Sequence, residues 1–90
     1  MTYLITYEDD AQKVFSDLTV EERNQALKKL YEVASSEFRS PEQFDLKPLR
    51  GSDQRCKFRV GNGIRIILQI DKNAEMLHVS KVARRENLYQ

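Results

Sequence analysis

Residues 55–71 read RCKFRVGNGIRIILQID, and their apolar side chains recur at every second position. Successive side chains of a strand point to opposite faces of its sheet, so this period predicts two strands. Gly61-Asn62-Gly63 between them supplies residues that accept the positive φ angles of a hairpin turn. A turn at that place pairs Arg59 with Arg65 and puts Lys57 on the same face. The stretch therefore predicts an antiparallel hairpin with one apolar face and one cationic face.

The rest of the chain predicts two helices before the hairpin and one more strand after it. Thr19-Val20-Glu21-Glu22 is a capping box. The hydroxyl of Thr19 and the carboxylate of Glu22 can accept hydrogen bonds from backbone amides that have no partner at the start of a helix. Leu27, Leu30, Tyr31 and Ala34 then share one helical face, which we expect to be buried. In chain order we expect a strand at 2–7, a short helix beginning at 9 or 10, a helix from 19 to 35, and strands at 55–60, 64–71 and 76–82.

These elements predict a single α+β domain covering residues 1–90, because a chain of this length forms one modest core. The N-terminal strand and the two-helix hairpin are expected to pack on an antiparallel sheet, in the order β-α-α-β-β-β. Residues 36–54 form a long connection, and long connections in compact domains are uncommon. We expect Phe44, Leu46 and Leu49 to hold this connection against the domain.

Charge is distributed unevenly along the chain, although the net charge is only +1. Residues 1–45 carry five Lys and Arg against ten Asp and Glu, whereas residues 46–90 carry ten against four. A basic half of this kind favours a polyanionic partner over a solvated surface. One cysteine excludes an internal disulfide, and no apolar run approaches the roughly 20 residues that span a bilayer. With no secretory leader at the start, we expect a cytoplasmic protein that does not bind membranes.

The residue types exclude several kinds of active site. The chain has one histidine, His78, and one cysteine, Cys56, so it lacks a ligand set for a metal and needs no cofactor. Cys56 alternates with apolar residues and is expected in the core, and His78 is expected to be structural. No phosphate-binding glycine loop and no catalytic triad is visible. Any catalysis must therefore use Lys, Arg and Tyr.

Those residue types suit the cleavage of RNA by its own 2′-hydroxyl, because the substrate then supplies the nucleophile. Arginine forks match phosphate oxygens and stabilise the charge of the transition state. A lysine acts as a base only where neighbouring cations lower its pKa from about 10.4, and Lys57 stands between Arg55 and Arg59. Tyr89 is suited to stack on a base or to orient the 2′-hydroxyl.

Several segments, taken in order, resemble the RelE/ParE toxin superfamily. They are Leu49-Arg50-Gly51, Lys57-Phe58-Arg59-Val60-Gly61, Arg65-Ile66-Ile67-Leu68 and Val82-Ala83-Arg84-Arg85-Glu86-Asn87-Leu88-Tyr89. The resemblance implies the toxin of a type II toxin–antitoxin system. The RelE branch of this superfamily cuts mRNA in the ribosomal A site without a metal, and the ParE branch poisons DNA gyrase.

The resemblance also implies roles for individual residues. It assigns catalysis to Lys57, Arg65, Arg85 and Tyr89, with Arg85 as the acid or leaving-group stabiliser. It assigns phosphate binding to Arg55, Arg59 and Arg84. Arg59 stands where RelE-type enzymes keep a second lysine. Because arginine is a poor base, this departure moves the role of base to Lys57.

The partners implied are a cognate antitoxin, the ribosome and mRNA, with operator DNA bound through the antitoxin. Because the chain ends one residue after Tyr89, we expect the antitoxin to cover the cationic face directly and not to displace a terminal helix. Two alternatives stay open at this point. One is a ParE-type gyrase poison with the same fold, and the other is a nucleic-acid-binding module without catalysis. The full set of cationic residues favours the ribonuclease.

Overall fold

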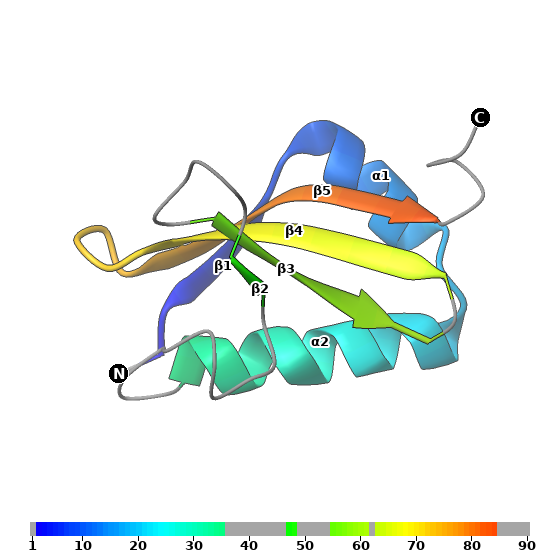
Figure 1. The fold of residues 1–90 in the computed structure, drawn as a ribbon, viewed down its shortest axis with the longest axis horizontal. Coiled ribbons are helices and arrows are strands. Elements are labelled where there is room, and N and C mark those ends of the chain that lie inside the picture. Colours follow the sequence, from blue (N-terminus) through cyan, green and yellow to red (C-terminus); the bar gives the residue numbers. More distant parts are fainter. Residues whose placement is uncertain (1, 36–46, 49–54, 62, 85–90) are drawn as a thin grey trace.

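Seven elements make up the fold in the computed structural model, which describes residues 2–35, 47–48, 55–61 and 63–84. They are β1 (Leu4–Tyr7), α1 (Asp9–Ser16), α2 (Val20–Ser35), β2 (Lys47–Pro48), β3 (Arg55–Val60), β4 (Ile64–Asp71) and β5 (Met76–Arg84). Figure 1 shows one sheet, with α2 running along its length. The predicted order of elements is confirmed. Phe44, Leu46 and Leu49, expected to hold the connection, lie outside the described residues.

The hairpin of β3 and β4 has the register that its sequence predicts. Val60 pairs with Ile64, and Arg59 pairs with Arg65. Gly61 has a φ of 59°, in the left-handed region that glycine enters without steric cost. Because this turn sets the register, it also decides which side chains lie next to one another across the two strands.

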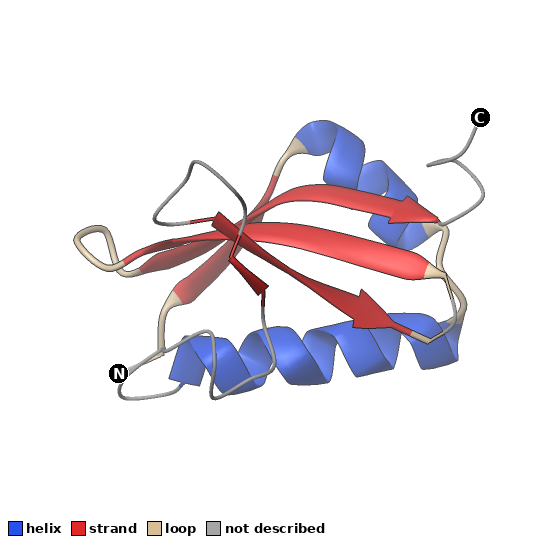
Figure 2. Ribbon diagram, viewed as in Figure 1, coloured by secondary structure: helices blue, strands red, loops and turns tan. Residues whose placement is uncertain are grey.

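The five-stranded sheet has the order β1-β5-β4-β3-β2 and is mixed (Figure 2). The strands β3, β4 and β5 are antiparallel neighbours, as predicted, and β2, which was not predicted, pairs antiparallel with β3. At the other edge β1 pairs with β5 in parallel, with Leu4 opposite Met76. Between β1 and β5 the chain passes through both helices on one face of the sheet, continues to β2 at the opposite edge, and returns through β3 and β4, so that β5 lies beside β1.

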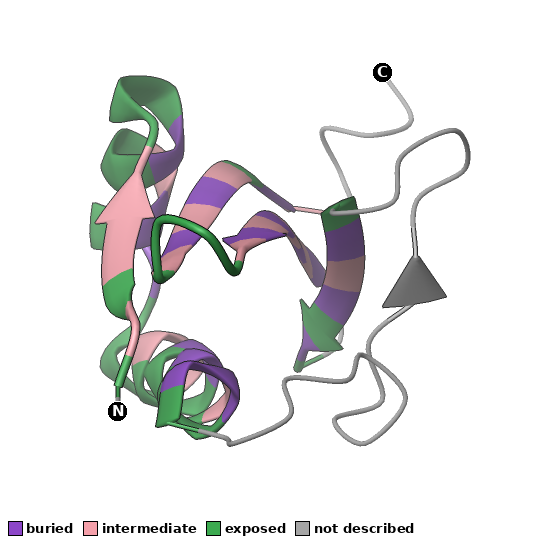
Figure 3. Ribbon diagram, turned by 90° about the vertical axis from the view of Figure 1, so that its left-hand side faces the viewer, coloured by how far each residue is buried: buried purple, intermediate pink, exposed green. Residues whose placement is uncertain are grey.

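One face of the sheet packs against both helices. Burial alternates along β3 and β4, as the bands of colour along these strands show (Figure 3). The inward side chains of the strands join those of the helices in one core, which contains Ala11, Phe15, Leu18, Ala26, Leu30, Val33, Ala34, Cys56, Phe58, Val60, Ile64, Ile66, Leu68, Ile70, Leu77, Val79 and Val82. We call the opposite face of the sheet the open face.

The start of α2 has the predicted capping box. The Thr19 hydroxyl accepts a hydrogen bond from the Glu22 backbone N–H at 3.1 Å, and the Glu22 carboxylate accepts one from the Thr19 N–H at 3.0 Å. These reciprocal bonds satisfy two amides that have no partner within the helix.

The predicted buried stripe of α2 is wrong in two of its four residues. Leu27 is 40% exposed and Tyr31 is 60% exposed, whereas Ala26 and Val33 are fully buried beside Leu30. The small side chains of Ala26 and Val33 let the helix lie close to the sheet. The larger Leu27 and Tyr31 therefore lie on a flank of the helix, one turn apart.

A β-bulge at Ser80 changes the alternation of β5. Ile67 pairs with Lys81 and Leu68 with Val79, so Ser80 has no residue opposite it on β4. Its hydroxyl donates a hydrogen bond to the Ile67 carbonyl at 3.3 Å. Beyond the bulge the exposed Lys81 is followed by the buried Val82. If Ser80 were instead paired with Ile67, Lys81 would take the inward position, so the bulge keeps this lysine out of the core.

Candidate functional site

Three cations from two neighbouring strands lie together on the open face of the sheet. Lys57 and Arg59 come from β3 and Arg65 from β4, each flanked by core residues in the alternation of its strand. Arg59 and Arg65 are directly opposite one another, where side chains of an antiparallel pair lie about 5 Å apart. We call Lys57, Arg59 and Arg65 the cationic face. Within the described parts of the chain, none of the three is in an ion pair.

The cationic face is unfavourable for the protein alone. Like charges directly across a ladder repel and destabilise the pair. Arg59 is exposed, but Arg65 is half-buried, so water screens its charge less. Moreover, the Nε atom of Arg65 is buried and has no hydrogen-bond partner among the described residues. A buried donor without an acceptor costs about 1–3 kcal/mol. A bound oxyanion on this face would relieve the repulsion between Arg59 and Arg65.

Arg84 lies on the other side of the sheet. It pairs with Ile64, a core residue, and its guanidinium reaches α2 to form an ion pair with Glu22 at 3.2 Å. A second bond joins Arg84 Nη1 to the other Glu22 oxygen at 3.4 Å. The backbone hydrogen bond from Thr19 lowers the pKa of the Glu22 carboxyl, and Arg84 lowers it further. The structure therefore does not bring Arg84 together with the cationic face.

Sequence reasoning missed the contact between Glu22 and Arg84. The capping box identified Glu22 only as a local helix-start residue. Its partner is 62 positions away in the chain, and no spacing pattern points to a contact at that distance. The relevant signal is the bulge in β5, which turns Arg84 toward α2 and which the sequence pattern did not predict.

The other predicted site residues have different positions. Arg55 is exposed at the start of β3, where it pairs with Gln69. Arg85 and Tyr89 lie outside the described residues, so their catalytic roles remain predictions. Of the predicted set, the structure brings together Lys57, Arg59 and Arg65, which carry donors suited to phosphate oxygens.

His78 is a structural residue, as its strand context predicts. Its Nδ1 is hydrogen-bonded to the Thr6 hydroxyl at 2.7 Å and its Nε2 to the Glu8 carboxylate at 2.9 Å. Both ring nitrogens are thus satisfied, and the imidazole joins β5 to β1 and to the segment that follows β1. Among the described residues no group of three or more His, Cys, Asp or Glu side chains could hold a metal ion.

Cys56 is expected to resist alkylation, because it is only 1% exposed and burial raises the pKa of its thiol to about 11. Relative to an ordinary thiol, the reactive thiolate at pH 8 is therefore about 100-fold scarcer. Iodoacetamide should modify the folded chain at least that much more slowly than the chain in guanidinium, as measured by mass spectrometry. Equal rates in the two conditions would contradict the burial of Cys56.

None of the described helices is long and apolar enough to cross a membrane. The sequence matches no family model and no curated protein.

Solved structures do match the fold. A mutant of the E. coli toxin RelE in the free state is 27% identical in sequence, with a TM-score of 0.78 over 97% of this chain and 87% of that chain. The toxin–antitoxin complex RelBE of E. coli gives 26% identity and a TM-score of 0.76, over 91% and 95% of the two chains. An archaeal RelE–RelB complex from Pyrococcus horikoshii has the same fold at 20% identity and a TM-score of 0.68, over 94% and 97%. From its fold and these matches, the chain belongs to the RelE-type toxin superfamily.

Proposed function

We propose that this toxin is a metal-independent endoribonuclease that cuts mRNA on the ribosome and so inhibits translation. The observation that carries the proposal is the cationic face, where Arg59 and Arg65 lie opposite one another and Lys57 lies on the same face. Such a cluster is costly in the free protein and favourable when a phosphate group lies over it.

In the proposed reaction the RNA provides its own nucleophile. The 2′-oxygen attacks the adjacent phosphorus, its proton passes to Lys57, and a bond between oxygen and phosphorus forms. Arg59 and Arg65 stabilise the negative charge on the phosphorane oxygens. The bond from phosphorus to the 5′-oxygen then breaks, and Arg85 stabilises or protonates the leaving oxygen. The products are a 2′,3′-cyclic phosphate and a free 5′-hydroxyl.

Tyr89 is proposed to stack on a base or to orient the 2′-hydroxyl. Arg55 and Arg84 are proposed to contact RNA phosphates at the edge of the site. For Arg84 this role would require that its guanidinium leave the Glu22 carboxylate, which it contacts at 3.2 Å. Lys57 is the proposed base because its neighbour on this face, Arg59, is an arginine, and arginine is a poor base.

We further propose that the chain is held inactive by a cognate antitoxin. Two of the matched E. coli structures are complexes of RelE with RelB or with a RelB peptide. An antitoxin segment with carboxylates over Lys57, Arg59 and Arg65 would neutralise the cationic face and exclude RNA from it. The same antitoxin would carry the complex to operator DNA, and both proteins would act in the cytoplasm, where mRNA is translated.

Induction of the chain in growing bacteria tests the proposal. We expect rapid loss of protein synthesis and mRNA ends that carry 2′,3′-cyclic phosphates, and we expect Arg85→Ala to relieve the growth arrest because the leaving oxygen loses its partner. Mapping of RNA ends and pulse labelling with methionine measure the two effects. Lys72→Ala, a charge loss in the exposed turn between β4 and β5, is the matched control and should remain toxic.

Two results would count against the ribonuclease. Filamentation and DNA damage with intact mRNA would instead support a gyrase poison. Full toxicity of Arg85→Ala would remove that residue from the mechanism.

A further inference from the structure

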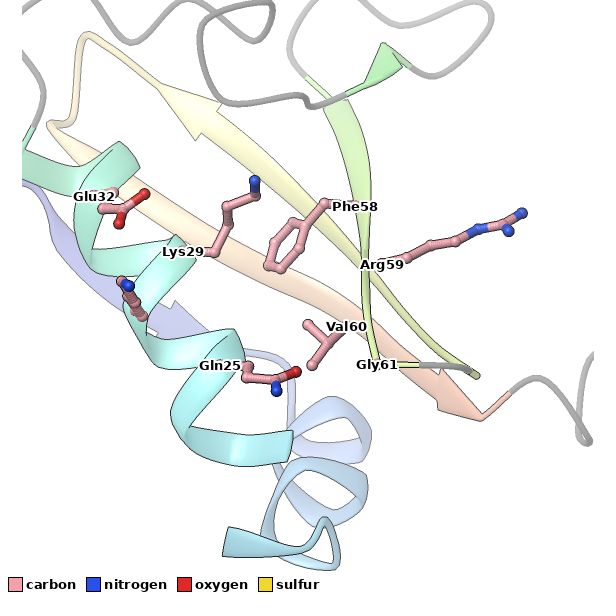
Figure 4. Close-up of a pocket in the computed structure, with 8 residues that line it drawn as sticks. Gln25, Lys29, Glu32, Phe58, Arg59, Val60 and Gly61 are labelled. Carbon is pink, nitrogen blue, oxygen red and sulfur yellow. The ribbon is translucent and has the colours of Figure 1, made fainter. Parts of the chain in front are cut away.

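A hollow lies between α2 and the end of β3, and it shares the residue Arg59 with the cationic face (Figure 4). Its volume is about 320 Å³. It is lined by Gln25, Lys28, Lys29 and Glu32 of α2, and by Phe58, Arg59, Val60 and Gly61 at the end of the hairpin strand. We call this hollow the α2–β3 groove.

The α2–β3 groove carries an excess of positive charge. Lys28 and Lys29 contribute two cations and Glu32 is the one carboxylate among the lining residues, while the guanidinium of Arg59 points away from α2. Although Lys28 and Glu32 are four residues apart on α2, a spacing that allows an ion pair, the structure contains none between them. Among the residues that the structure describes, neither Lys28 nor Lys29 forms an ion pair, so both amino groups can contact an external anion.

The floor of the groove offers little apolar surface. Phe58 and Val60 point toward α2 in Figure 4, yet they are only 5% and 4% exposed because they belong to the core. The exposed apolar residues of α2, Val20, Leu27 and Tyr31, do not line the groove. A peptide that docks in a groove depends on apolar anchors, whereas a phosphate backbone depends on cations. The groove therefore favours a nucleic acid over an acidic peptide.

Arg59 connects the groove to the cationic face. Arg59 is one of the residues that line the groove, but its guanidinium points away from α2, on the opposite side of β3 (Figure 4). On the outer edge of β3, the described part of β2 pairs only with Cys56 and Lys57. No described strand covers the edge from Phe58 to Val60. A strand of RNA on the cationic face can thus continue past Arg59 into the groove.

We propose that the α2–β3 groove is a second phosphate-backbone site, which binds single-stranded RNA flanking the segment held on the cationic face. This inference rests on the proposed function, because it assumes an RNA substrate. Lys28 and Lys29 contact phosphates there and add affinity without taking part in the chemical step. The groove carries no sequence information, since cations on phosphates position an RNA but do not read its bases.

The test is the salt dependence of RNA binding by the full chain. The probe is a fluorescein-labelled single-stranded RNA of 20 nucleotides and mixed sequence, and anisotropy is measured between about 20 and 150 mM KCl, the range in which counterion release dominates. Each lost phosphate contact lowers the slope of log K against log salt by about 0.7 for single strands. Lys28→Gln/Lys29→Gln should therefore lower the slope by about 1.4. Lys28→Arg/Lys29→Arg should retain it, because the charge is kept.

The matched control is Lys13→Gln/Lys72→Gln, which removes two exposed lysines from α1 and from the turn between β4 and β5. This control should leave the slope unchanged. An equal fall in both double variants would overturn the proposal, since net charge alone would explain it. An unchanged slope for the Lys28/Lys29 variant would also overturn it. The proposal would also be overturned if the Lys28→Gln/Lys29→Gln variant lost affinity for a polyglutamate peptide but kept its affinity for RNA. The groove would then be a site for protein.

Failure of the proposed function has a different signature. Absence of mRNA cleavage by the parent chain, together with the predicted fall in slope, would refute the ribonuclease and leave the RNA groove supported. Cleavage by the parent chain with no change in slope would refute the groove alone.

Discussion

Arg65→Gln is expected to lower the rate of mRNA cleavage by about 10²–10³-fold, the usual effect of removing one preorganised donor from a charged transition state. The same substitution should not lower the free energy of unfolding. It removes the charge that faces Arg59 directly across the ladder, and relief of such repulsion is worth up to about 1 kcal/mol. A loss of activity without a loss of stability is the signature of a residue retained for function.

Two measurements on purified protein check this expectation. Cleavage of mRNA on programmed ribosomes gives the rate, and urea denaturation gives the free energy of unfolding. Lys13→Gln is the matched control, because Lys13 is exposed on α1 and lies away from the open face of the sheet. It should cleave at the parent rate. A normal rate for Arg65→Gln would refute its role, and a large loss of stability would show that Arg65 is structural.

Ile66→Ala is expected to lower the free energy of unfolding by about 2–5 kcal/mol, a large part of the total stability of a small domain. Ile66 is fully buried in the middle of β4, opposite Phe58 on one side and Val82 on the other. Truncation would leave a cavity between strands that are held in register and cannot collapse freely.

The shift of the urea midpoint measures this loss. Ile66→Val removes a single methylene at the same place and should cost only about 0.5–1.5 kcal/mol. Similar values for the two variants, or no change in either, would contradict the position of Ile66 at the centre of the core.

The sequence predicted the hairpin best, because two independent local signals agreed there. The period of two assigned each side chain to a face, and a turn containing Gly61, with its φ of 59°, set the pairing. The opposition of Arg59 and Arg65 followed from these signals alone. The capping box of α2 was equally predictable, since its partners Thr19 and Glu22 are neighbours in the chain.

Features that depend on tertiary contacts were not predictable. On α2, the stripe through Leu27 and Tyr31 and the one through Ala26 and Val33 both have helical spacing and share Leu30 and Ala34. The choice between them depends on how closely the helix approaches the sheet, which favours the smaller residues. The parallel pairing of β1 with β5 likewise depends on contacts between segments about 70 residues apart, such as Leu4 opposite Met76.

The candidate site was predictable only in part for the same reason. Lys57, Arg59 and Arg65 belong to the hairpin, so local rules placed them together. Arg84 was assigned to RNA from its resemblance to a motif, but strand alternation after the bulge turns it toward Glu22. The α2–β3 groove combines Lys29 with Phe58, and only the packing of the helix on the sheet joins those residues.

The bulge at Ser80 also affects how the length of this chain can vary. Ser80 has no residue opposite it on β4, so its deletion would place Lys81 directly after Val79 as an ordinary strand residue, still opposite Ile67. Lys81 would then still face outward, and Arg84 would still reach Glu22. The bulge is therefore a place where β5 can lose one residue without exchanging its two faces. Homologous chains without the bulge should be one residue shorter in this strand, with the same side chains facing the core.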